Sequence, residues 1–167
     1  MSGERRIISI LVDNEFGTLA RIVGLFSARG YNIESLSVAI VDNDRNLSKI
    51  NIVTSGEQRT IDLITKLLER IVPVYKAIDI STGADTIERS LCLCKVVCIG
   101  DKRLEALRIS ETFRANIVDA TDKSFVFEVF GKHDKIEAFI SLMKPLGLLE
   151  VSKTGVVAML RGDKSVF

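Results

Sequence analysis

The residues best suited to chemistry lie in the short stretch Asp13–Leu19, between a strand-like and a helix-like segment. Gly17 allows a backbone conformation or a close approach that a side chain would prevent. The free N–H groups and positive dipole at the start of the following helix favour an anion such as a carboxylate. Asn14 adds an amide that donates and accepts hydrogen bonds. The pattern is consistent with an anion-binding loop, and an ordinary turn built from Asn and Gly explains the same residues.

A second set of reactive side chains is the three cysteines, Cys92, Cys94 and Cys98. In a strand all three point to the same face, because side chains alternate. A zinc site normally uses closely spaced cysteine pairs or nearby histidines, and the single histidine, His133, follows only after another helix-sized segment. We therefore expect the three cysteines to behave as small buried hydrophobic side chains of a protein in a reducing compartment. His133 is expected to be solvated at the start of a helix. No catalytic residue and no metal site are predicted.

The composition narrows the class of protein. The chain has 167 residues, of which 47% are hydrophobic and 27% charged, and its net charge is +1. The charges are interspersed, so neither nucleic acid nor an anionic membrane surface is an expected partner. No apolar run approaches the roughly 20 residues of a membrane span, and no secretory signal is visible. We expect a cytoplasmic globular protein.

The elements that position these residues follow from hydrophobic periodicity, which divides the chain into two successive βαββαβ sets. The stretch Thr82–Thr86 predicts a boundary between domains at 1–81 and 82–167. Such a unit is α+β and ferredoxin-like, an antiparallel sheet with both helices on one face. Strands are expected at 7–12, 31–41, 47–54, 74–81, 91–99, 117–120, 125–130 and 148–152, with a short edge strand at 155–160. Helices are expected around 19–26, 61–71, 103–113 and 136–143, the third with Leu104, Leu107 and Phe113 inward.

The second strand of the first unit, 31–41, is expected at an edge of its sheet, because right-handed crossovers place the first and third strands centrally. Its only charge is Glu34. Natural edge strands are charged, bulged or paired. The simplest pairing is a two-fold homodimer through this strand.

The order of residues in several segments resembles the small subunit of acetohydroxyacid synthase (acetolactate synthase). The first segments are Asp13-Asn14-Glu15-x-Gly17-x-Leu19-x-Arg21 and the highly specific run Gly24–Leu36. Later segments, Ala115–Asp119 and Ser152–Asp163, agree, so the resemblance covers nearly the whole chain. By the same resemblance the N-terminal unit is an ACT domain, an amino-acid-binding regulatory module. The family usually has a small residue where this chain has Phe16.

The resemblance implies a regulatory subunit of branched-chain amino acid biosynthesis. It would activate the large catalytic subunit and confer feedback inhibition by valine, isoleucine or leucine bound between two ACT domains. The loop of one copy would hold the amino acid's carboxylate, and residues of the other copy its ammonium. The expected effector-binding residues are Asn14, Glu15, Phe16, Gly17, Thr18, Leu19, Asn32 and Ile33. No cofactor is expected in this chain, because thiamine diphosphate, Mg²⁺ and FAD belong to the family's large subunit.

Three other functions are alternatives to that of a regulatory subunit. An enzyme is disfavoured, because no nucleophile–base pair, phosphate loop or metal cluster stands out. An RNA recognition motif shares the βαββαβ order, but its third strand presents aromatic residues, which are absent from 47–54. Aromatics do occur at 125–130, without the basic, glycine-containing opening of that motif. A free-standing amino-acid sensor that controls another partner remains open.

Overall fold

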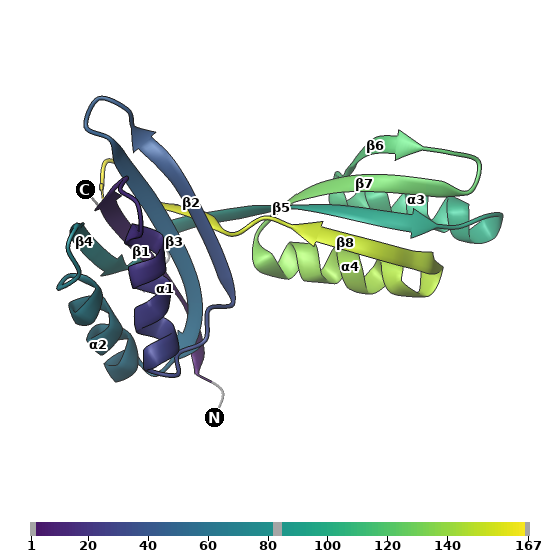
Figure 1. The fold of residues 1–167 in the computed structure, drawn as a ribbon. Coiled ribbons are helices and arrows are strands. Elements are labelled where there is room, and N and C mark those ends of the chain that lie inside the picture. The colour runs from purple at the N-terminus through teal and green to yellow at the C-terminus, as the bar shows by residue number, and fades with distance from the viewer. Residues whose placement is uncertain (1–2, 82–84, 166–167) are drawn as a thin grey trace. The chain divides into compact units, whose positions relative to one another are not determined.

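The computed structural model describes residues 3–81 and 85–165. These residues form two compact units (Figure 1). The first contains 3–81, 85–87 and 155–165, and the second contains 88–154. Each unit has the predicted βαββαβ order. The α+β, ferredoxin-like fold class is therefore confirmed.

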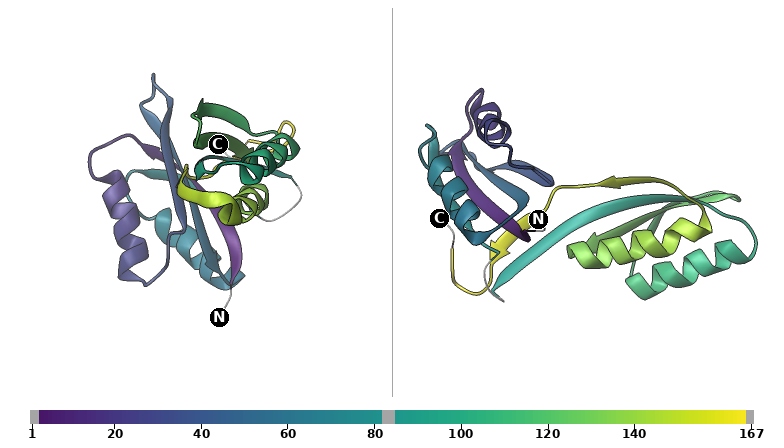
Figure 2. Two further views of the ribbon diagram at one scale, coloured as in Figure 1. Left: turned by 90° about the vertical axis from the view of Figure 1, so that its right-hand side faces the viewer. Right: turned by 90° about the horizontal axis from the view of Figure 1, so that it is seen from below.

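The first unit is an antiparallel sheet with two helices. Its elements are β1 (Glu4–Asp13), α1 (Thr18–Ala28), β2 (Ser35–Asp42), β3 (Leu47–Gly56), α2 (Gln58–Leu68) and β4 (Val74–Asp79). The strand order β2-β3-β1-β4 places β2 at an edge, as the crossover rule predicts. Both helices cover the same face of the sheet (Figures 1 and 2).

The second unit repeats this arrangement with a longer first strand. Its elements are β5 (Thr86–Val97), α3 (Asp101–Phe113), β6 (Asn116–Ala120), β7 (Ser124–Gly131), α4 (His133–Gly147) and β8 (Leu148–Lys153). The strands are ordered β6-β7-β5-β8, and β9 (Val157–Leu160) pairs with β5 off this path. His133 begins α4 and is exposed, as expected.

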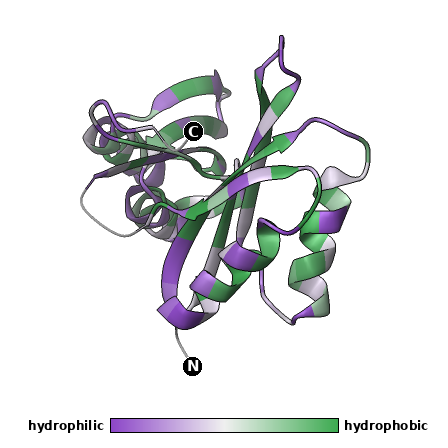
Figure 3. Cartoon of the chain, turned by 90° about the vertical axis from the view of Figure 1, so that its left-hand side faces the viewer, coloured by the Kyte–Doolittle hydropathy of each residue, from purple (hydrophilic) through white to green (hydrophobic). Residues whose placement is uncertain are grey.

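The core of the first unit follows from the two periodicities of its sequence. Alternate residues of β1 and β3, such as Ile8 and Ile52, point toward the helices, because side chains alternate along a strand. They meet one stripe of each helix, represented by Ile22 and Ile61. Hydrophobic and hydrophilic residues accordingly alternate along the helices of this unit (Figure 3).

The core of the second unit contains the three cysteines, each at most 4% exposed, together with Phe127 and Phe139. The prediction of buried cysteines is confirmed. The prediction for the inward face of α3 was wrong at Leu104, whose side chain is 58% exposed. The small residues Ala106 and Ser110 are buried in that helix instead. A helix that packs closely through small side chains gives a weak hydrophobic pattern.

The segment after residue 154 belongs to the first compact unit. The sequence instead predicts a second domain that spans 82–167. Val156 and Ala158 are buried against Ile7, Val53 and Ile80, on the sheet face that the helices leave free. Alternation identifies the buried residues of a strand but not the sheet that buries them. Part of the predicted boundary, residues 82–84, lies outside the described residues.

Across the described ranges, no helix is long and apolar enough to cross a membrane.

Candidate effector site

The loop between β1 and α1 ends in an uncapped helix start. Gly17 occupies the N-cap position in the left-handed conformation, with φ 82° and ψ −7°. No side chain caps the helix, and its first turn contains no acidic residue. Among the described residues, the backbone N–H groups of Gly17, Leu19 and Ala20 find no acceptor. Free donors at the positive end of a helix dipole are suited to bind a carboxylate.

The loop is held in place by the neighbouring turn between β2 and β3. The backbone N–H of Asn14 donates to the carbonyl oxygen of Asn46 at 2.8 Å. The Asn46 side-chain amide donates to the Asn14 carbonyl at 3.1 Å, and Asn14 Nδ2 donates to Asn46 Oδ1 at 3.3 Å. The Asn14 amide therefore has a structural role and keeps its own Oδ1 as a further acceptor.

Two further residues anchor this end of the unit. Tyr75 donates its hydroxyl to Asp13 Oδ1 at 2.9 Å, and Arg21 Nη1 donates to the Val72 carbonyl at 2.7 Å. The Asp13 carboxylate raises the pKa of Tyr75 through this hydrogen bond. Sequence reasoning did not identify Asn46 or Tyr75. The polar turn at 42–46 was the only sequence signal for Asn46, and its separation from Asn14 hides the contact.

The loop residues differ sharply in exposure. Phe16 is fully exposed, Leu19 is 36% exposed, and Asn14, Glu15 and Gly17 lie at the surface. Thr18 is only 3% exposed, and its Oγ1 atom has no hydrogen-bond partner in the structure. A buried hydroxyl without a partner costs about 1–3 kcal/mol, so a group that reaches it stabilises the loop.

Asn32 and Ile33 lie at the other end of the same sheet. Thr54 Oγ1, near the end of β3, donates to the Asn32 carbonyl at 2.6 Å. Asn46, which holds the loop, precedes the start of β3. At the rise of an extended strand, the two positions are about 25 Å apart. Within one chain, the structure brings Asn14–Leu19 together but does not bring Asn32 and Ile33 to them.

The edge strand β2 connects these two ends. Its outer side pairs with no other strand of the described chain, since β2 ends the sheet order. Val38, Ile40 and Val41 are 49%, 51% and 55% exposed. Ser35, at the start of β2, follows Asn32 closely, and Asp42, at its end, pairs with Leu47, which in turn pairs with Asp13. One end of β2 therefore adjoins Asn32, and the other adjoins the loop.

The three cysteines of the second unit are buried. The sulfur atoms of Cys92 and Cys94 lie 3.4 Å apart, and both residues are fully buried. The contact with Cys92, together with burial, raises the pKa of the Cys94 thiol. Burial raises the pKa of Cys98. Within residues 3–81 and 85–165, no group of three His, Cys, Asp or Glu side chains is arranged to hold a metal ion.

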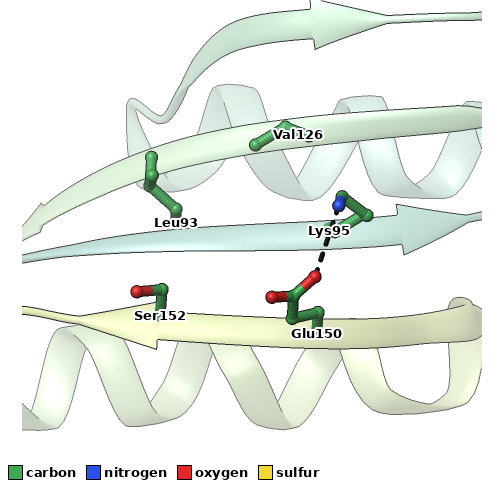
Figure 4. Close-up of a pocket in the computed structure, with 5 residues that line it drawn as sticks. All are labelled: Leu93, Lys95, Val126, Glu150 and Ser152. Atoms are coloured by element: carbon green, nitrogen blue, oxygen red, sulfur yellow. Dashed lines mark hydrogen bonds and ion pairs between the residues drawn. The ribbon is translucent and has the colours of Figure 1, made fainter.

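A shallow depression on the helix-free face of the second sheet is lined by Leu93, Lys95, Val126, Glu150 and Ser152 (Figure 4). Lys95 Nζ and Glu150 Oε2 form an ion pair at 3.3 Å across it. The ion pair engages both charged side chains of the depression, and its other lining residues are Leu93, Val126 and Ser152.

Comparisons with known proteins agree over nearly the whole chain. A family model described as "AHAS small subunit-like ACT domain" matches residues 8–76, and one described as "Small subunit of acetolactate synthase" matches residues 89–162. The acetolactate synthase small subunit of Haemophilus influenzae is 42% identical over 97% of this chain and 99% of its own. The isozyme 3 small subunit of Escherichia coli is 40% identical over 96% and 98%.

A solved structure extends this similarity to three dimensions. The acetolactate synthase small subunit from Thermotoga maritima has a TM-score of 0.86 and 32% identity, covering 96% of this chain and 99% of that one. The sequence matches, the two family models and this fold are consistent with one another. The chain belongs to the family of acetolactate synthase small subunits, and its N-terminal unit is an ACT domain.

Proposed function

We propose that the chain binds valine, or the related isoleucine or leucine, between two ACT domains and thereby controls the catalytic large subunit of acetolactate synthase. The observation that carries this proposal is the uncapped, acid-free start of α1 behind the left-handed Gly17. An α-amino acid has a carboxylate for these free donors and an ammonium for nearby acceptors. Family membership supports a regulatory role in the branched-chain amino acid pathway.

We call the Asn14–Leu19 loop and the pair Asn32 and Ile33 the two half-sites. Their separation within one chain supports a site built from two chains. In an antiparallel pair, the start of one strand lies opposite the end of the other. Pairing β2 with β2 of a second copy would therefore place Asn32 and Ile33 of one chain near the Asn14–Leu19 loop of the other. The uncharged, half-exposed side chains of Val38 and Ile40 are suited to such an edge.

In this arrangement each residue has a distinct role. The N–H groups of Gly17 and Leu19 bind the carboxylate, and the Asn32 side chain of the second copy accepts from the ammonium. Leu19, Phe16 and the second copy's Ile33 surround the aliphatic side chain. Since each site requires both chains, effector binding and dimer geometry are thermodynamically coupled.

The catalytic partner completes the proposed assembly. Thiamine diphosphate, Mg²⁺ and FAD would be bound by the large subunit in the cytoplasm, and this chain would supply regulation without chemistry. A homodimer of the chain would present its effector sites to that partner. Effector binding then changes the activity of a site that this chain does not contain.

Calorimetric titration of the full chain with valine, isoleucine and leucine tests the binding proposal, with alanine as a control for the aliphatic side chain. Saturable binding of at least one branched-chain amino acid is expected, with one site per chain. Activity of the reconstituted large subunit is then followed at the same effector concentrations. Binding without any effect on that activity would favour a sensor for another partner, and no binding would refute the effector site.

A further inference from the structure

The segment after β8 crosses the helix-free face of the first sheet and contacts its edge strand. We call residues 155–160 the strap. Figure 1 shows it in yellow, passing behind β2 and β3. It contains Val156, Ala158 and Leu160, which pack against that face of the sheet. The strap belongs to the same compact unit as the candidate effector loop.

Two serines of β2 hold the strap by its backbone. The Val156 N–H donates to Ser35 Oγ at 3.2 Å, and Ser37 Oγ donates to the Val156 carbonyl at 2.7 Å. Ser35 and Ser37 are two residues apart, so their side chains leave the same face of the strand. Both backbone groups of Val156 are thereby satisfied by side chains of the edge strand.

The strap also lies very close to the backbone of β2. A Cβ atom added at Gly155 would lie 2.1 Å from the Leu36 carbonyl oxygen, far inside contact distance. Only a glycine permits this approach without displacing the strap or the strand. Gly155 is therefore a second point of close contact between the strap and β2, in addition to the two serine hydrogen bonds.

Beyond β2 the strap is anchored across the rest of the sheet. Lys49 of β3 donates to the Ala158 carbonyl at 3.0 Å. Val156 and Ala158 are 7% and 6% exposed, packed against Ile7, Val53 and Ile80 of the inner strands and the chain just beyond β4. The strap thus ties the edge strand to the more deeply buried part of its own sheet.

We infer that the strap is a positioning element for the effector site, and that Ser35, Ser37 and Gly155 set effector affinity without touching the effector. An edge strand has ladder hydrogen bonds on one side only, so its position depends on other contacts. The strap supplies such contacts at Ser35–Ser37, the end of β2 that adjoins Asn32. The inference rests on the proposed function, which requires β2 to pair with a second copy.

The test uses the full chain with two kinds of variant. Ser35→Ala/Ser37→Ala removes both hydroxyl groups, and Gly155→Ala forces the strap away from Leu36. The matched controls are Ser35→Thr/Ser37→Thr, which keeps both hydroxyls on a strand-compatible residue, and Gly24→Ala, where an added Cβ meets nothing within 4 Å. Dimer dissociation is measured by sedimentation, valine affinity by calorimetry and unfolding by thermal melting.

We expect both strap variants to bind valine about tenfold more weakly than the parent, because two net hydrogen bonds are lost or displaced. For the same reason, their dimers should dissociate at a higher protein concentration than the parent dimer. The threonine pair and Gly24→Ala should match the parent. If Gly155→Ala does not fold, the serine pair decides the question. Parent-like dimerisation and valine affinity in the serine pair would overturn the inference. If the parent itself binds no branched-chain amino acid, the proposed function fails, and sedimentation alone still decides the role of the strap.

Discussion

At the scale of single residues, Gly17 combines a left-handed backbone with the free donors of α1. Gly17→Asp would place a negative charge against a docked carboxylate, which we expect to cost about 2–4 kcal/mol of valine affinity, or roughly 30- to 1000-fold. Gly17→Asn is the matched control, since Asn and Asp have the same shape and both tolerate φ > 0. Calorimetry on both variants separates charge from shape. Equal affinities for the two would argue against an anion at this position.

Asn32 offers a milder test of the second half-site. Asn32→Ala should weaken valine binding by about 1–2 kcal/mol, by removing one polar partner of the ammonium. The contact with Thr54 is made by the Asn32 backbone carbonyl, so the substitution leaves it in place. Thermal unfolding should therefore be unchanged while the calorimetric affinity falls. An unchanged affinity would remove Asn32 from the site.

The buried thiols make a separate prediction about the second unit. Cys94 and Cys98 have raised thiol pKa values, and all three cysteines are at most 4% exposed. Because the thiolate is the reactive form, the native chain should react with a thiol reagent such as DTNB far more slowly than the denatured chain. Absorbance of the released thiol product measures both rates. Rapid reaction of the native chain would show that this core opens readily.

At the scale of elements, β2 is the strand whose pairing matters most. Val38→Lys should weaken self-association, through loss of apolar contact and approach of like charges across a two-fold axis. Leu63→Lys on α2 is the matched control, because Leu63 is 44% exposed and Val38 49%. Sedimentation at several protein concentrations should show dissociation of the first variant only. If neither variant dissociates, the chains associate through another surface.

At the scale of the whole molecule, the described residues contain no group of three His, Cys, Asp or Glu side chains that could hold a metal ion, and the family is that of a small subunit. We expect the purified chain to form no acetolactate from pyruvate by itself and to raise the activity of a large subunit added to it. A colorimetric acetolactate assay with each component alone and with both together measures this. Product formation by this chain alone would contradict a purely regulatory role.

Much of the architecture could be predicted from the sequence, because it depends on local periodicity and general rules. Alternation in β1 and β3 and the stripes at Ile22 and Ile61 give the element order and inward faces. The handedness of crossovers then gives the strand order and the edge position of β2. The uncapped start of α1 also follows from residue types, since a glycine at the N-cap has no side chain to accept from the first N–H groups of the helix.

The tertiary structure decided what depends on contacts between distant segments. Val156 and Ala158 were predicted to be strand residues, but only the fold shows that they pack on the first sheet. The contacts of Asn46 with Asn14 join residues of two separate turns, and no local pattern encodes them. The roughly 25 Å between the loop and Asn32 follows from the length of β3 and from the long-range contact of Thr54 with Asn32. Periodicity tells which side of a strand is buried, whereas long-range packing chooses the partner that buries it.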